Sequence, residues 1–145
     1  MSKPSFVYVT YIRATPQKIW QALTDADITA RYWGHRNVSD WQPNSRWEHR
    51  RNDQSGAADI VGTVIESDPP RRLLVSWAVP GTESDPQQVS RVTYDIVEHK
   101  DGVSKLTVTH TELEENSKML RGISDGWPIV LSSLKSFLET GEGVL

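Results

Sequence analysis

The sequence predicts an α+β fold in which a curved antiparallel sheet of about six to seven strands wraps around a long C-terminal helix. Three observations support this prediction. A strand-like segment near the N-terminus is followed by two short helical patterns, the middle of the chain holds only short segments separated by turns, and the last apolar pattern has helical spacing. Strands grouped together with helices outside the group are typical of a sheet covered by helices. We expect one domain over residues 1–145.

The N-terminal part of the chain predicts one strand and two short helices. Residues 6–13 (FVYVTYIR) are rich in β-branched and aromatic side chains, as is typical of strands. Thr15 and Pro16 then form a helix-start signal, because Thr can cap a helix and Pro is tolerated at its first position. A second short helix is expected over residues 26–32, with Asp25 as its N-cap.

The middle of the chain predicts short strands that are separated by turns. In the last two of them apolar and polar residues alternate, which is typical of an antiparallel sheet with only one covered face. Before the final helix, residues 114–121 are expected to form a separate helical turn or two. We place the strands at residues 37–41, 46–51, 58–67, 72–79, 91–96 and 105–110.

The C-terminal segment at residues 124–141 is the longest helical pattern in the chain. Ser124 or Asp125 is the expected N-cap, and Pro128 then falls in or just after the first turn, where its missing N–H costs little. Gly141 follows the last apolar residue and predicts a left-handed C-cap. The apolar residues form one wide face that must pack on the sheet: Ile123, Trp127, Val130, Leu131, Leu134, Phe137 and Leu138.

The composition excludes several classes of function. The formal net charge of -3 gives no electrostatic support for nucleic-acid binding. No apolar run reaches the roughly 20 residues that a membrane span needs, so no such span is expected. The absence of cysteine removes disulfides and thiolate chemistry, and from these features together we expect a cytoplasmic protein. The six tryptophans suit either a core or the wall of an apolar ligand cavity.

Histidines are the main candidates for polar chemistry, although no pair has the spacing of a metal site. We therefore expect no metal and no other cofactor. His110 continues the apolar face of its strand, and it is either a hydrogen-bonded core residue or a polar anchor or general base in a pocket. His49 alternates with Trp47 and is either an exposed strand residue or part of the same pocket.

Motifs along nearly the whole chain resemble those of a known family. The chain is similar to the helix-grip superfamily called SRPBCC or START-like, and more specifically to the family of activator of heat-shock-chaperone ATPase homologues. This resemblance implies a helix-grip fold and a ligand cavity under the last helix. The matching segments are residues 12–24 (IRATPQKIWQALT), Tyr32-Trp33, residues 62–66 (GTVIE), residues 69–73 (PPRRL), Trp77 and Gly126-Trp127-Pro128.

The leading functional hypothesis is that the protein binds a hydrophobic or amphipathic small molecule between the sheet and the last helix. The family name implies an alternative, a chaperone co-factor or stress-response partner, and a homodimer is possible. Some members of the superfamily are cyclases, but no catalytic motif is present and we assign no catalytic residue. The expected lining residues are Trp33, Trp47, Trp77, Tyr94, Trp127 and Leu131, with His49 and His110 as polar anchors.

Overall fold

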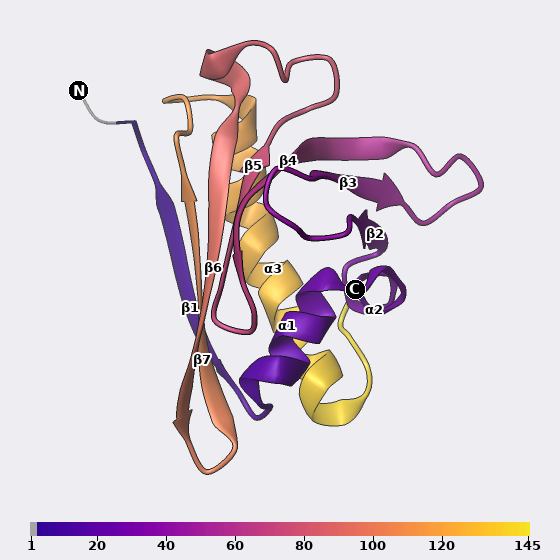
Figure 1. Ribbon diagram of the computed structural model, residues 1–145, viewed down its shortest axis with the longest axis vertical. Coiled ribbons are helices and arrows are strands. Elements are labelled where there is room, and N and C mark those ends of the chain that lie inside the picture. The colour runs from indigo at the N-terminus through magenta and orange to yellow at the C-terminus, as the bar shows by residue number, and fades with distance from the viewer. Residues whose placement is uncertain (1–2) are drawn as a thin grey trace.

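A computed structural model describes residues 3–145 and confirms the predicted fold class. Seven strands form one antiparallel sheet in the order β1-β7-β6-β5-β4-β3-β2, which curls around the last helix (Figure 1). The strands are β1 (Phe6–Ile12), β2 (His35–Val38), β3 (Arg46–Arg51), β4 (Ala58–Asp68), β5 (Arg72–Trp77), β6 (Ser90–Lys100) and β7 (Val103–Thr111). The helices are α1 (Pro16–Thr24), α2 (Ala26–Tyr32) and α3 (Lys118–Thr140), with a single 3₁₀ turn at Pro86–Gln88.

The two short helices begin where the sequence predicted. The Thr15 side chain accepts a hydrogen bond from the backbone N–H of Lys18, and Pro16 occupies the first helical position. The Asp25 side chain accepts from the backbone N–H groups of Asp27 and Ile28 at the start of α2. These caps satisfy backbone donors that have no partner inside the helix.

Two strand predictions are wrong at their ends. The strand expected at residues 37–41 is β2, which pairs with β3 only over His35–Val38. The chain leaves the sheet before Trp41, whose left-handed backbone (φ 59°) is incompatible with a continued strand. The strand expected to reach Val79 ends at Trp77, and Val79 is exposed.

The prediction for the start of the C-terminal helix is also wrong. α3 begins about two turns earlier, with Ser117 as its N-cap, so Ser124 and Asp125 lie inside the helix. The side chain of Ser117 accepts a hydrogen bond from the backbone N–H of Leu120, at 3.0 Å. Pro128 therefore sits within the helix, where it removes one backbone hydrogen bond. Gly141 is the left-handed C-cap that the sequence predicted, with φ 92°.

Gly62 on β4 allows a side chain of β3 to reach across to β5. The indole N–H of Trp47 donates to the carbonyl oxygen of Ser76 at 2.8 Å. A Cβ atom on Gly62 would lie 1.9 Å from that oxygen and 2.5 Å from Nε1 of Trp47. The register also shifts on β4 between Val64 and Glu66. This part of the sheet is therefore curved, and its inner face turns toward α3.

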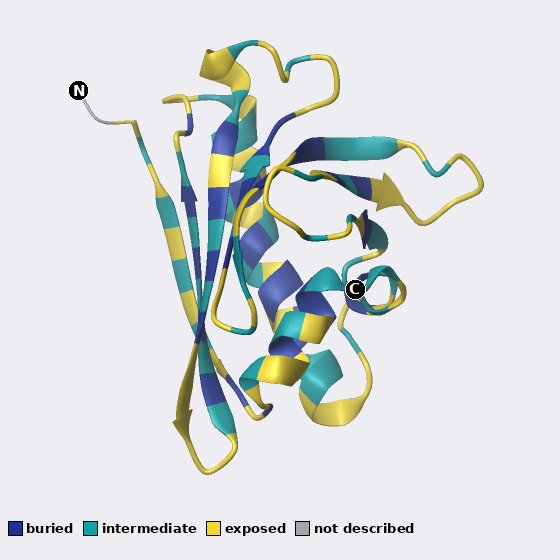
Figure 2. Ribbon diagram, in the orientation of Figure 1, coloured by how far each residue is buried: buried dark blue, intermediate teal, exposed yellow. Residues whose placement is uncertain are grey.

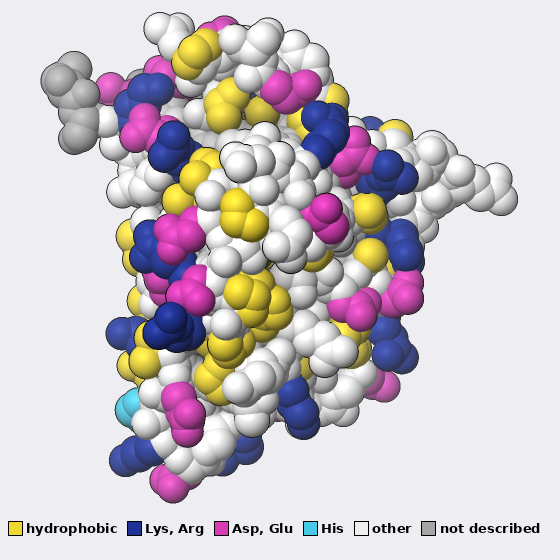
Figure 3. Space-filling view, viewed as in Figure 1, with side chains coloured by type: hydrophobic (Ala, Val, Ile, Leu, Met, Phe, Trp, Pro, Cys, Tyr) yellow, Lys and Arg dark blue, Asp and Glu magenta, His cyan; other side chains and the backbone are white. Residues whose placement is uncertain are grey.

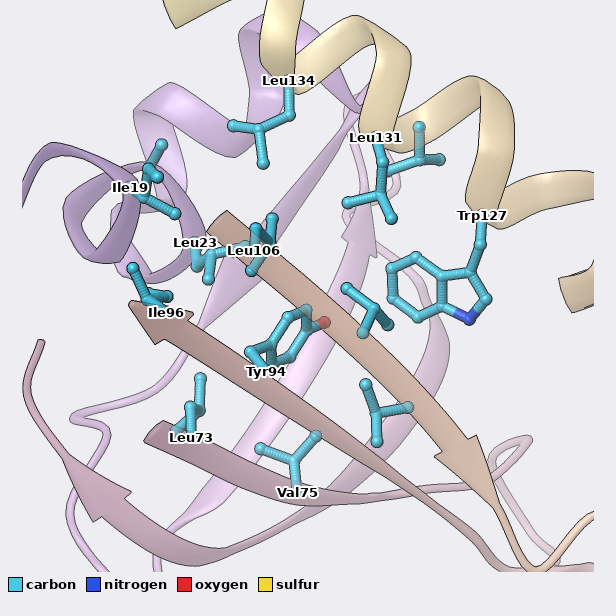
Figure 4. Close-up of a cluster of buried hydrophobic side chains, with 14 of the residues drawn as sticks. Ile19, Leu23, Leu73, Val75, Tyr94, Ile96, Leu106, Trp127, Leu131 and Leu134 are labelled. Atoms are coloured by element: carbon cyan, nitrogen blue, oxygen red, sulfur yellow. The ribbon is translucent and has the colours of Figure 1, made fainter. Parts of the chain in front are cut away.

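The core lies between the inner face of the sheet and the helices, and the outer face of the sheet carries most of the exposed strand positions (Figure 2). Figure 4 shows side chains of α1 and α3 above those of the strands. Trp127, Leu131 and Leu134 project from α3 toward the sheet. The buried strand residues opposite them include Leu73, Val75, Tyr94, Ile96, Leu106 and Val108.

On the face shown in Figure 3, acidic and basic side chains are interspersed. Ion pairs among the described residues include Arg71 with Asp68 at 2.8 Å and Arg72 with Asp95 at 3.2 Å. This face therefore carries no large field of one sign. Among the described residues, no helix is both long and apolar enough to cross a membrane.

Candidate functional site

A small cavity lies between α3 and the strands that curl toward it. Its volume is about 130 Å³. An engineered cavity of about 150 Å³ with apolar walls binds benzene, so this space suits a group of that size. The lining residues come from the segment after α2, from β3 and β5, and from α3: Trp33, His49, Trp77, Gly122, Ile123, Gly126, Trp127 and Val130.

The cavity walls are aromatic rings in contact with one another. The ring of Trp127 lies 5.5 Å from that of Trp33 and 5.5 Å from that of Trp77, measured between centroids. The ring of His49 lies 4.8 Å from that of Trp33. The rings are tilted rather than stacked face to face, as is usual for aromatic pairs. Helix and sheet thus meet through these rings.

His49 has one nitrogen engaged and one free. Its Nδ1–H donates to Oδ1 of Asn37 at 2.5 Å, and the backbone N–H of Asn37 donates to Oγ1 of Thr29 at 2.9 Å. Within residues 3–145, Nε2 of His49 forms no hydrogen bond. Burial, together with the nearby imidazole of His35, lowers the pKa of His49 to about 3. At neutral pH the ring is therefore uncharged, and Nε2 is a hydrogen-bond acceptor.

His110 has both ring nitrogens engaged. The indole N–H of Trp127 donates to Nδ1 of His110 at 3.0 Å, so the imidazole proton must be on Nε2. That Nε2–H donates to Oγ of Ser90 at 2.7 Å, and the Ser90 hydroxyl donates to the carbonyl oxygen of Trp77 at 3.2 Å. Burial lowers the pKa of His110 to about 3, which keeps the ring neutral. The indole nitrogen of Trp127, both ring nitrogens of His110 and the hydroxyl of Ser90 therefore all have partners.

The sequence left three roles open for His110: a hydrogen-bonded core residue, a polar anchor or a general base. This geometry favours the hydrogen-bonded core residue. A general base for Ser90 would need a lone pair on the nitrogen that faces the hydroxyl. Nε2 carries a proton instead, because Nδ1 accepts from Trp127. The arrangement of Ser90 and His110 therefore stabilises the fold but does not activate the hydroxyl.

The structure brings half of the predicted site residues to the cavity wall. Trp33, His49, Trp77 and Trp127 line it. The other four lie behind this wall in the core, where each is at most 4% exposed: Trp47, Tyr94, His110 and Leu131.

Sequence reasoning missed the two glycines of α3 that line the cavity, Gly122 and Gly126. Their spacing of four within an apolar helical pattern was the available signal, since residues four apart share a helix face. It also missed Asn37, which fixes the tautomer of His49. No sequence spacing relates Asn37 to His49, because only the pairing of β2 with β3 places them opposite each other.

A larger hollow of about 410 Å³ lies at the N-terminal end of α3. It is formed mainly by the loop between β5 and β6 and by the segment between β7 and α3, and it has no aromatic wall. Ser90 lines this hollow and Trp127 lines the smaller cavity, so the hydrogen bonds through His110 connect the walls of the two spaces. Many of the residues that line the larger hollow are exposed and polar, such as Gln87 and Glu114.

The family model described as "Activator of Hsp90 ATPase homolog 1-like protein" matches residues 13–139. The chain belongs to this family. A search of curated protein sequences gave no significant match. Among solved structures, the Aha1 dimer from Colwellia psychrerythraea is 23% identical with a TM-score of 0.78, and the match covers 97% of this chain and 99% of that one.

Two further solved structures show the range of proteins that share this fold. An HSP90 activator from Plasmodium falciparum is 23% identical, with a TM-score of 0.69 and coverage of 85% of this chain and 86% of that one. DynU16, a putative protein in the dynemicin biosynthetic locus, is 18% identical with a TM-score of 0.74, and the match covers 96% of this chain and 48% of that one. At these identities the likeness supports the shared fold and leaves function open.

The two buried histidines predict that acid destabilises the protein. An unfolded histidine has a pKa of 6.5, whereas the folded pKa of His49 and of His110 is about 3. Below pH 6.5 the unfolded chain thus binds protons that the folded chain does not, and stability is lost as the pH falls. For two such groups we expect the free energy of unfolding to decrease by about 4 kcal/mol between pH 7 and pH 5.

Urea unfolding at several pH values in this range measures the loss, and most carboxylates stay ionised there. The variant His49→Phe should show about half of the decrease, because one of the two titrating groups is gone. A free energy of unfolding that stays constant between pH 7 and pH 5 would contradict the assignment of two neutral buried imidazoles.

Proposed function

We propose that this protein binds a small apolar or amphipathic molecule in the cavity beneath α3. The observation that carries the proposal is the pair of glycines, Gly122 and Gly126, in the helix wall of the cavity. A Cβ atom at either position would meet nothing within 4 Å. Alanine would therefore fit at both, and each glycine costs the helix roughly 1 kcal/mol relative to alanine.

Packing does not account for this cost, because no neighbouring group needs the space that the missing side chains leave. The space belongs to the cavity and its mouth, where Gly122 is exposed and Gly126 is half-buried. Larger side chains at these positions would narrow the entrance. The glycines thus support a cavity that has to stay open to solvent.

The walls favour an apolar ligand of limited size. Among the described residues no charged side chain lines the cavity, and its wall includes three indole rings and the aliphatic residues Ile123 and Val130. The volume of about 130 Å³ suits one ring or a compact branched group. A longer ligand would place this group inside and extend through the mouth beside Gly122.

The segment of α3 that covers the cavity has the lowest intrinsic helix stability in that helix. Pro128 lacks the N–H that would bond the carbonyl oxygen of Ser124, and Gly122 and Gly126 have low helix propensity. The second half of α3 is anchored by the hydroxyl of Ser133, which donates to the carbonyl oxygen of Tyr32 at 2.6 Å. The backbone of this part of α3 is therefore weak in itself, and the indole N–H of Trp127, which donates to His110, holds it to the sheet.

Toluene is a suitable probe for this proposal, because it matches the cavity in size and polarity. We expect toluene to shift the indole N–H resonances of Trp33 and Trp127 in the wild-type protein, and Gly126→Leu to weaken its binding by at least about tenfold, since the added side chain is comparable in size to the ligand. Ser132→Leu adds the same side chain at an exposed position of α3 and is the matched control.

The control should bind toluene as the wild-type protein does. Equal affinity in Gly126→Leu and Ser132→Leu would place the ligand elsewhere and sink the proposal. So would a wild-type protein that shows no response to toluene near its solubility limit.

A second candidate role is self-association through β1. β1 is an edge strand that contains neither proline nor a charged residue, and Val7, Val9 and Tyr11 are exposed on it at 56%, 46% and 44%. Edge strands of monomers are usually protected by charges, proline or a covering element. Among the described residues, Nζ of Lys135 donates to the carbonyl oxygen of Tyr11 on this strand at 2.7 Å. A second copy of β1 could pair with this edge, and one similar solved protein is described as a dimer.

Light scattering after size-exclusion chromatography tests this second candidate. We expect the wild-type protein to elute with the mass of a dimer at about 100 µM and Val9→Lys to elute as a monomer, because a charge on an edge strand opposes pairing. Val97→Lys is the matched control, since Val97 is 59% exposed but lies on the internal strand β6. A monomeric wild-type protein would refute this role.

A further inference from the structure

We propose that the ligand of the α3 cavity is a neutral ring compound that donates a hydrogen bond, from a hydroxyl or a ring N–H, to Nε2 of His49. This inference rests on the proposed function and adds the chemical class of the ligand. His49 and His110 have four ring nitrogens between them, and three of these form hydrogen bonds within the protein. The inference assigns a binding role to the fourth, Nε2 of His49.

The tautomer of His49 is fixed by its hydrogen bond to Asn37. Oδ1 of Asn37 can only accept, so the proton of the imidazole is held on Nδ1, at 2.5 Å from that oxygen. Asn37 is itself 3% exposed, and Thr29 holds its backbone at 2.9 Å. Nε2 therefore presents a lone pair, and a ligand group that faces it must be a donor.

Nε2 of His49 has no hydrogen-bond partner among the described residues, although the whole residue is only 5% exposed. It is not one of the sealed-off polar atoms without a partner, which are Nδ1 of His35 and the indole nitrogens of Trp41 and Trp77, so the lone pair stays accessible from the cavity that His49 lines. A ligand donor in the cavity can therefore reach it. His110 provides the contrast, because its two nitrogens are both satisfied by Trp127 and Ser90.

The cavity offers no group that would balance the charge of a ligand. Among the described residues no charged side chain lines it, so an anion would find no counter-charge and would face the lone pair of His49. The charged groups nearest to His49 are already paired with each other. Asp59 accepts from Nε2 of His35 at 2.9 Å and from Nε of Arg51 at 2.9 Å.

The shape of the cavity suits a flat ring. The indole rings of Trp33, Trp77 and Trp127 give the cavity flat walls, and flat rings pack on such walls with large contact area. The cavity volume of about 130 Å³ admits one six-membered ring with a small substituent. Phenol has this size, and its hydroxyl can donate to Nε2 while its ring contacts the indoles.

Paired titrations with phenol and toluene test the inference, since the two molecules differ by a donor group on the same ring. Their affinities are measured for the wild-type protein and for His49→Phe, which keeps a flat ring but removes the acceptor. We expect the preference for phenol over toluene, expressed as the ratio of the two dissociation constants, to fall by about five- to tenfold in His49→Phe. His99→Phe changes an exposed histidine on β6 and should leave the ratio unchanged.

The outcomes separate this inference from the proposed function. If toluene binds and His49→Phe leaves the ratio unchanged, the donor inference is overturned and the cavity remains a binding site. If neither molecule binds the wild-type protein, the proposed function itself fails. If His49→Phe does not fold, the wild-type protein is tested alone. Phenol, but not toluene, is then expected to move the ¹⁵N resonance of His49 Nε2 upfield. No movement of this resonance with phenol overturns the inference.

Discussion

The hydrogen bond from Trp127 to His110 is the contact on which the geometry of the site depends. Apolar packing holds α3 against the sheet, but such packing is non-directional and would tolerate a rotated helix. The indole N–H of Trp127 removes this freedom, because it must reach Nδ1 of His110, whose Nε2–H is bonded to Ser90. One chain of hydrogen bonds thus connects α3 to β7, β6 and the end of β5. With the helix fixed in this rotation, Gly122 and Gly126 lie over the cavity.

The same aromatic residues that build the core also determine how small the cavity is. A curled sheet around a helix encloses space, and here the side chains of Trp47, Trp77 and Trp127 occupy much of it. The remaining volume of about 130 Å³ lies at one end, where Trp33 and His49 complete the wall. This remaining space is too small for a lipid or a large polycyclic molecule.

Much of the fold could be predicted from the sequence, because its determinants are local. Thr15 and Asp25 cap their helices as expected, and alternating residues on β6 and β7 are buried as the period of two requires. The start of α3 was missed because Gly122 resembles a helix stop, whereas Ser117 caps the helix before it. The site was only partly predictable. The aromatic excess indicated the wall residues, but the partner of His49 depends on strand pairing that no local pattern contains.

Two buried histidines are neutral and hold opposite tautomers: His110 fixes α3, and His49 leaves an acceptor facing the cavity. Long-range ¹H–¹⁵N spectra of the histidine side chains measure this directly, because protonated and unprotonated ring nitrogens differ strongly in chemical shift. At pH 7 we expect the proton on Nε2 in His110 and on Nδ1 in His49, with both patterns unchanged down to pH 5. Either ring appearing as the other tautomer, or becoming doubly protonated between pH 7 and pH 5, would contradict the account.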